Sequence, residues 1–155
     1  MNNKTAEQES RANNLILHHL PEQASDDNAT ASEKDMSQVT QMFTNHLGIQ
    51  CDRPKSTTRL GIKTDRSRPL KVVMCSEQDK ITVIMSARKL KDATEPFKTV
   101  SIASDMSREE REENRRMIEE AKRLDGLEQS GDFIHLVRGP PWRRRIIRVE
   151  RRRKT

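Results

Sequence analysis

The stretch NLILHHLP, residues 14–21, decides the fold. It is a short apolar run that ends at a proline, and it is short enough for a buried strand. The stretch RPLKVVMC, residues 68–75, has the same character, and its proline is tolerable because it lies at the beginning of the strand. Residues 57–62 and 98–104 have a similar pattern. We therefore predict four strands.

Two helices are expected between these strands. The first is predicted to begin at Ser32, with apolar residues at helical spacing through Leu47 and with Gly48 at its end. Asp35, three residues after Ser32, comes close to a capping box. Ser76 is predicted to cap the second helix, with Asp79 at the same spacing. Each helix has one apolar stripe that can cover a sheet.

The resulting order is β-α-β-β-α-β over residues 13–105. This order predicts an α+β fold of the ferredoxin-like class, with two helices on one face of a four-stranded antiparallel sheet. The other face would be free to meet a ligand. The polar segment before it, residues 1–12, is expected to be a disordered lead, and it has no apolar core of a secretory signal.

Two further pieces follow this domain. Ser107 and Glu110 form the capping box of a charged helix over residues 106–126. Residues 131–149 predict a basic β-hairpin, and residues 150–155 a basic tail. From Arg138 onward, nine Lys or Arg residues stand against one acid, Glu150. The remainder of the chain is slightly acidic, so the basicity belongs to this end.

Composition narrows the class of protein. The chain has 155 residues with 32% hydrophobic and 35% charged residues, which fits one modest core with charged flanks. No apolar run is long enough to span a membrane. The two cysteines, Cys51 and Cys75, suggest no disulfide framework, so a reduced intracellular compartment is expected.

No catalytic constellation is expected. The four histidines have no metal-ligand spacing, and adjacent His18 and His19 would point to opposite faces of a strand. No phosphate-binding glycine loop and no nucleophile elbow occurs. We therefore predict a protein that is not an enzyme, with no cofactor, no metal and no small-molecule substrate.

The basic side chains are the candidate nucleic-acid-binding residues, because phosphate contacts release counterions. Solvated strand ends are the alternative for the sheet cations, and a tail that aids solubility is the alternative for the hairpin. Trp142 either stacks on a base or anchors the hairpin. The candidates are Arg59, Lys63, Arg68, Lys71, Arg138, Trp142, Arg143, Arg144, Arg145, Arg148, Arg151, Arg152 and Arg153.

The two buried strands resemble the two short signatures of RNA-recognition motifs. In that family, aromatic side chains on these strands stack on bases. Here Ile16 occupies the aromatic position of the first strand, and residues 68–75 hold no aromatic residue. We therefore expect any binding to be electrostatic and tolerant of sequence.

A wider resemblance rests on residues 11–22, Arg59–Gly61 with residues 68–72, residues 104–111, and the RGPPW of residues 138–142. Together these look like the RNA-recognition-like domains in first-open-reading-frame (gag-like) proteins of LINE-type non-LTR retrotransposons. The resemblance implies binding of RNA or single-stranded DNA, packaging into a cytoplasmic or nuclear ribonucleoprotein, and nucleic-acid chaperoning. By position, it makes Arg59, Arg68 and Lys71 phosphate-contacting residues.

The family resemblance leaves two points open. The coiled coil that trimerises some members is absent, since no sustained heptads precede residue 14, and self-association stays open. The alternative function is a protein-interaction module, in which the half-charged helix and the aromatic-poor sheet bind a partner and the basic tail acts as an import signal.

Overall fold

The structure, a computed structural model, describes residues 5–22, 27–141 and 143–151. It divides the chain into two compact units. The larger is Glu9–Asp105, and the smaller contains the residues from Met106 onward together with those up to Gln8.

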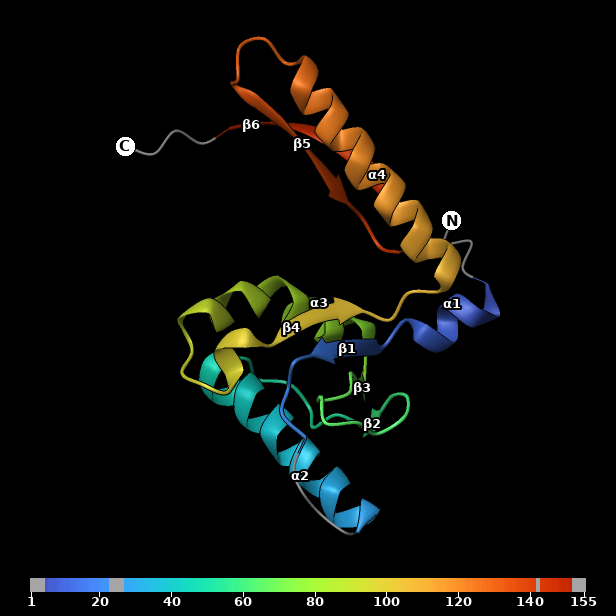
Figure 1. Cartoon of the computed structure of the whole chain (residues 1–155), viewed down its shortest axis with the longest axis vertical. Coiled ribbons are helices and arrows are strands. Elements are labelled where there is room, and N and C mark those ends of the chain that lie inside the picture. The colour runs from blue at the N-terminus through green and yellow to red at the C-terminus, as the bar shows by residue number, and fades with distance from the viewer. Residues whose placement is uncertain (1–4, 23–26, 142, 152–155) are drawn as a thin grey trace. The chain divides into compact units, whose positions relative to one another are not determined.

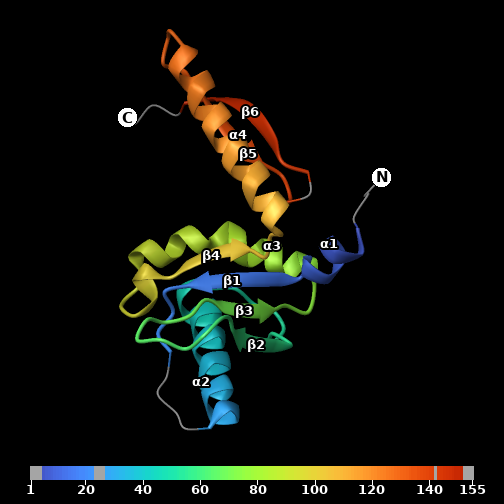
Figure 2. The same ribbon diagram turned by 45° about the vertical axis from the view of Figure 1, so that its right-hand side comes forward.

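The larger unit is built on one antiparallel sheet. Its strands are β1 (Asn14–His18), β2 (Ser56–Arg59), β3 (Leu70–Val73) and β4 (Ser101–Ser104). Their spatial order is β2-β3-β1-β4, and every neighbouring pair is antiparallel, as Figure 2 shows. Helix α2 (Asn28–Gln41) connects β1 to β2, and helix α3 (Glu77–Ser86) connects β3 to β4. The expected α+β class is confirmed.

One face of this sheet carries the core. Leu15 and Leu17 of β1 and Leu70 and Val72 of β3 have no exposed surface. Full burial of such side chains contributes about 1.5–3 kcal/mol each. They pack in one cluster with side chains from both helical regions, so α2 and α3 cover the same face. The helical members are Val39, Met42, Phe43, Val83 and Leu90.

The alternate residues of each strand point to the opposite face. The register places Thr58, Lys71, Ile16 and Ala103 side by side across the four strands. Lys71, Ile16 and Ala103 are only half-buried, and Thr58 is exposed. Lys71 therefore points away from the helices. We call this row the open sheet face.

The helix ends agree with the sequence in part. The Ser76 side chain accepts a hydrogen bond from the Asp79 amide, and Gly48 adopts a left-handed φ of 65° after a π-helical turn, Met42–His46. The predicted cap at Ser32 is wrong. Helix α2 begins one turn earlier because the Asp27 side chain accepts a hydrogen bond from the Ala29 amide. An earlier cap of equal quality displaces a later one.

The expectation of disorder before residue 13 also needs correction. A short helix, α1 (Ala6–Arg11), lies in this segment. The Thr5 hydroxyl accepts a hydrogen bond from the Gln8 amide, and the Gln8 side chain accepts one from the Thr5 amide. This reciprocal pair is a capping box with glutamine at its third position.

From residue 106 onward, the smaller unit holds a helix and a hairpin, which lie side by side in Figure 1. Helix α4 (Arg108–Leu127) begins with the predicted capping box of Ser107 and Glu110. The strands β5 (Phe133–Arg138) and β6 (Arg145–Glu150) pair antiparallel and place Arg138 opposite Arg145. The expected helix and the expected hairpin are therefore both present, and α4 packs mainly against β5.

Candidate nucleic-acid interface

Arg59, a predicted phosphate contact, is a structural residue. Its side chain is 6% exposed and forms a two-point ion pair with Asp35: Nε lies 3.1 Å from Oδ2, and NH2 lies 2.8 Å from Oδ1. Its remaining donors bind the backbone oxygens of Leu20, Pro21 and Arg68 at 2.8–3.0 Å. All five guanidinium N–H groups are used. No donor is left for a phosphate, and this corrects the sequence-based role.

Arg68 is held in a similar way. Its Nε and NH2 bind the two oxygens of Glu22 at 2.8 and 3.2 Å, and its NH1 binds the Gly61 oxygen at 3.1 Å. The side-chain hydrogen bond from Arg68 is the largest influence on Glu22 and lowers the pKa of that carboxyl. Arg68 thus fastens the segment after β1 to the loop before β3. Three of its five guanidinium N–H groups are used in this way, so Arg68 is partly engaged in the fold and its phosphate role stays a prediction.

Lys63 and Lys71 are the two sheet candidates that remain accessible. Lys63 is exposed in the loop between β2 and β3, and Lys71 lies half-buried in the middle of the open sheet face. The neighbours of Lys71 across the strands are Thr58 and Ile16. The face therefore offers one central cation and no aromatic ring among these residues. Base stacking from this row is not available.

In the hairpin unit, Arg148 is also engaged. Its Nε and NH2 lie 2.6 and 3.2 Å from the two oxygens of Glu128, and its guanidinium carbon lies 3.7 Å from the centre of the Phe133 ring. The hydrogen bond from Arg148 lowers the pKa of Glu128. This arginine joins β6 to the end of α4, but it is 53% exposed and these bonds use two of its five N–H groups, so its phosphate role stays a prediction.

A histidine makes a second link between the helix and the hairpin. The His135 amide and its Nδ1 lie 2.6 and 2.8 Å from the same oxygen of Asp125. These contacts, the side-chain hydrogen bond first, lower the pKa of Asp125. The two links join the end of α4 to both strands of the hairpin, His135 from β5 and Arg148 from β6. The residues between these strands, 139–144, are called the hairpin turn.

The hairpin turn is narrow and gathers basic side chains. The Arg143 amide donates to the Pro140 oxygen at 2.9 Å, and Gly139 has a φ of 108°. A Cβ on Gly139 would lie 2.5 Å from the Arg143 oxygen, so only glycine fits there. Arg138, Arg143 and Arg145 are all exposed at this end. In the part of the chain that the structure describes, no ion pair with a carboxylate engages any of these three.

Arg144 differs from the arginines on either side of it. It is half-buried, and its Nε is out of contact with solvent and has no hydrogen-bond partner among the described residues. Burial lowers the pKa of this guanidinium, and the charge of Arg138 lowers it further, while Glu110 opposes them. Arg144 lines a cavity of about 390 Å³ between α4 and β5.

Other candidates lie at the edge of the description. Arg151 is exposed, and its amide donates to the Asp132 oxygen at 2.7 Å, which extends the pairing of the hairpin. Trp142, Arg152 and Arg153 lie outside the described residues. The question of whether Trp142 stacks on a base or anchors the hairpin therefore stays as the sequence left it.

The sequence missed two polar residues of the cavity, Asn114 and Lys122, which line it from α4. A signal for them existed. Asn114, Ile118, Lys122 and Asp125 recur at steps of three and four residues, which places them on one face of a helix. The sequence did not show that this face would meet the end of β5.

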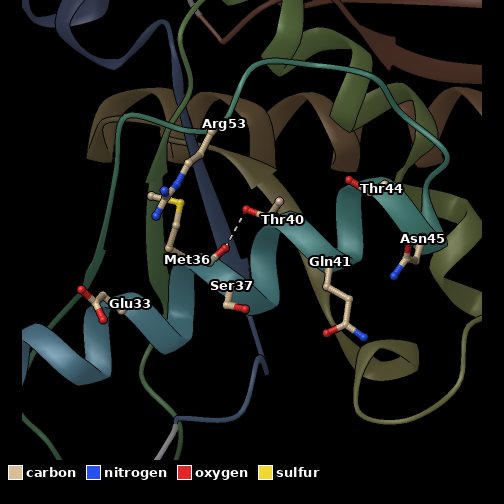
Figure 3. Close-up of a pocket in the computed structure, with 8 residues that line it drawn as sticks. All are labelled: Glu33, Met36, Ser37, Thr40, Gln41, Thr44, Asn45 and Arg53. Atoms are coloured by element: carbon tan, nitrogen blue, oxygen red, sulfur yellow. Dashed lines mark hydrogen bonds between the residues drawn. The ribbon is translucent and has the colours of Figure 1, made fainter.

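A second cavity, of about 550 Å³, lies along α2 (Figure 3). Neutral polar side chains line most of it, and the Thr40 hydroxyl is already bonded to the Met36 oxygen at 2.8 Å. Its two charged residues, Glu33 and Arg53, are exposed. Nothing in this lining selects a particular ligand.

Two searches of the described residues gave negative findings. No group of three or more His, Cys, Asp or Glu side chains is arranged to hold a metal ion within residues 5–22, 27–141 and 143–151. No helix in that part of the chain is both long and apolar enough to cross a bilayer.

Comparison with known proteins adds no relative to this description: no family model matches the chain, and no curated protein matches it.

Proposed function

We propose that this chain binds RNA or single-stranded DNA through the phosphate backbone, with low sequence specificity and without enzymatic activity. The observation that carries the proposal is the cluster of three exposed arginines, Arg138, Arg143 and Arg145, at the turn end of the hairpin. Arg138 and Arg145 are directly opposite each other across the two strands. Like charges placed opposite each other destabilise a strand pair. A bound polyanion would remove that repulsion.

The rest of the chain supports this assignment by contrast. Three exposed arginines of α4 have acidic partners one helical turn away: Arg108 pairs with Glu112, Arg116 with Glu113 at 2.7 Å, and Arg123 with Glu120. An opposite charge so close weakens the field of each arginine at a distance. The hairpin turn has no such compensation among the described residues, and an uncompensated basic surface attracts nucleic acid at a distance.

We further propose that the larger unit is a ferredoxin-like, RNA-recognition-like domain. The alternation of two helices with four strands and the strand order β2-β3-β1-β4 support it. With Ile16 and Lys71 in its central row, this sheet lacks the ring platforms that read single-stranded bases. The hairpin is therefore the main contact and the sheet a minor one. The resemblance to retrotransposon gag-like proteins extends the proposal to a ribonucleoprotein role.

The test is a salt titration of binding to single-stranded RNA and DNA of several sequences. The double variant Arg143→Ala/Arg145→Ala should weaken binding to all of them. For each lost contact on a single strand, the slope of log affinity against log salt should fall by about 0.7. The matched control, Arg116→Ala/Arg123→Ala, removes the same charge from α4 and should leave the slope near that of the unmodified protein.

Two results would overturn the proposal. One is the absence of binding to any nucleic acid at low salt, and the other is an affinity that does not respond to salt. Equal effects of the two double variants would show that only net charge matters and that the hairpin is not the interface.

A protein-interaction module is the second candidate. The observation in its favour is the exposure of large apolar side chains in the larger unit, with Ile62 at 88% and Met85 at 73%. The absorbance ratio at 260 and 280 nm of the purified chain separates the two candidates. A ratio free of nucleic acid, together with failure in the salt titration, favours the protein partner.

A further inference from the structure

The Arg144 side chain, from the hairpin turn, lines the cavity of about 390 Å³. Arg143 and Arg145 are exposed, whereas Arg144 is half-buried against α4 and β5. Its Nε–H is removed from solvent but meets no acceptor within the described residues. A buried donor on a charged group is costly when unpaired. The fold thus buries part of a guanidinium at a position where leaving its Nε–H without an acceptor costs free energy.

The cavity around Arg144 has the composition of an anion site. Cationic groups come from Arg144, Arg138 and Lys122, and the amide of Asn114 adds a neutral donor. The walls between them are apolar: Ile118, Ala121, Leu136 and Val137. Apolar walls lower the local dielectric constant and strengthen the attraction of a cation for an anion that enters.

Two carboxylates bear on the site. Asp125 lines the cavity, but its Oδ1 accepts hydrogen bonds from the amide and Nδ1 of His135. Glu110 raises the pKa of Arg144, but its effect is smaller than that of Arg138, which lowers this pKa. One of its oxygens is bound to the Ser107 amide at 2.9 Å, and the other, Oε2, is buried without a hydrogen-bond partner among the described residues. No ion pair joins this carboxylate to Arg144 in the described structure.

We propose that this cavity binds one phosphate group of a single-stranded nucleic acid, with Arg144 and Arg138 as its principal donors. This inference rests on the proposed function and deepens it, because it assigns one phosphate group to a defined cavity that Arg144 and Arg138 both line. The planar guanidinium with its fixed fork of donors suits a phosphate better than the point charge of a lysine does. Arg144 would then be a recognition residue, while Arg143 and Arg145 supply the long-range field.

Water is the competing occupant of the cavity, because it would pair the orphaned Nε–H of Arg144. The variant Glu110→Gln separates the two cases. Glutamine keeps the capping box of α4 but removes the negative charge. If phosphate is the ligand, Glu110→Gln should bind it more tightly than the unmodified chain does. A water-filled site would show no such gain.

The first experiment uses inorganic phosphate and does not depend on nucleic-acid binding. In the full chain, the Nε–Hε resonance of Arg144, assigned by its loss in Arg144→Lys, is followed by NMR as phosphate is added at constant ionic strength, with chloride as the control anion. The Arg144 resonance should shift and saturate, and the resonances of Arg143 and Arg145 should move little. A resonance that does not respond to phosphate, or that responds equally to chloride, overturns the proposal.

The second experiment measures affinity for oligouridylate. Arg144→Ala should weaken binding by about tenfold, the loss expected for a charge-assisted hydrogen bond. Arg145→Ala, the matched exposed control, should weaken it by no more than about threefold. Arg144→Lys keeps the charge and should still lose most of the affinity. Circular dichroism of each variant checks that the hairpin unit is folded, and Arg138→Ala repeats the test from the other strand if Arg144→Ala unfolds.

The outcomes distinguish the two proposals. If the chain binds RNA but Arg144→Ala and Arg145→Ala are equivalent, the phosphate site is wrong and the proposed function stands. If the chain binds no RNA while the Arg144 resonance still saturates with phosphate, the proposed function is wrong and the cavity is an anion site of another kind. Saturation by phosphate at molar concentration only, with no gain in Glu110→Gln, overturns the site.

Discussion

The clearest physical consequence of the structure concerns Arg59. The variant Arg59→Met removes the guanidinium and leaves the Asp35 carboxylate, whose side chain is 6% exposed, without its partner. It also removes the donors to the backbone oxygens of Leu20, Pro21 and Arg68. Methionine keeps much of the volume and apolar stem of arginine, so the loss is mainly one of charge and hydrogen bonds.

The magnitude follows from these contacts. Removing one partner of a buried ion pair costs about 3–5 kcal/mol, because a charge is left uncompensated in a site poor in water. A domain of this kind has a total stability of about 5–15 kcal/mol, so the variant loses a large share of it. Arg59→Lys keeps the charge but not the two-point geometry, and we expect it to lose about 1–3 kcal/mol.

The assay is urea unfolding of the full chain followed by circular dichroism, with a double-mutant cycle through Asp35. Asp35→Leu and Arg59→Met should each be destabilising, and the double variant should be less so than the sum of the two, because no unpaired charge remains. Under conditions where Arg59→Met is still folded, its affinity for RNA should equal that of the unmodified chain. A loss of less than about 1 kcal/mol, or a loss of RNA binding without a loss of stability, would refute the reasoning and restore Arg59 as a contact.

Two further predictions concern pH and the hairpin turn. Hydrogen bonding from Arg68 lowers the pKa of Glu22 in the folded state. The pair therefore stabilises the fold at pH values above the ordinary carboxyl pKa of 4.5. This stabilisation is lost as the pH falls below 4.5 and passes through the lower pKa of the folded state. The urea midpoint of Glu22→Gln should therefore lie below that of the unmodified chain at pH 7 and converge with it in acid; an equal gap at all pH values contradicts the pairing. Gly139→Ala should destabilise the hairpin by about 1 kcal/mol or more, since φ is 108° and the new Cβ would meet the Arg143 oxygen at 2.5 Å. Hydrogen exchange of the β5 and β6 amides measures this, with Gly131→Ala, a site with φ of 70° and open space, as the milder control, and unchanged protection in Gly139→Ala argues against the tight turn.

Local signals predicted the secondary structure where they were strong. The short apolar runs at residues 14–21 and 68–75 predicted the two central strands. The structure shows which face is buried, since Leu15, Leu17, Leu70 and Val72 alternate with less buried residues. Ser76 and the capping box of Ser107 marked helix starts, because each cap is a contact between residues three apart. The same rules failed where two local signals competed, as between Asp27 and Ser32, and where a glutamine box at Thr5 was overlooked.

The candidate site was less predictable. The sequence identified the basic end of the chain, and the structure places Arg138, Arg143 and Arg145 together at the turn of the hairpin. The sequence alone could not distinguish arginines that are free from arginines that are held in ion pairs. Arg59 and Arg68 look the same in the sequence as Arg143, yet their partners, Asp35 and Glu22, lie 24 and 46 residues away.

The sequence by itself thus determined the order of the elements and the end of the chain that holds excess positive charge. These properties depend on the period of apolar residues, on caps a few residues apart and on composition. Only the tertiary structure decided which residues contact the stretch NLILHHLP and which cations form structural ion pairs and hydrogen bonds. It pairs Lys71 with Ile16 of that stretch and joins Leu20 and Pro21 to Arg59. It also leaves Arg144 Nε without a hydrogen-bond partner among the described residues. The physical reason is that burial and pairing are set by groups that meet only after the chain has closed upon itself, and a free and a paired guanidinium have the same sequence signature.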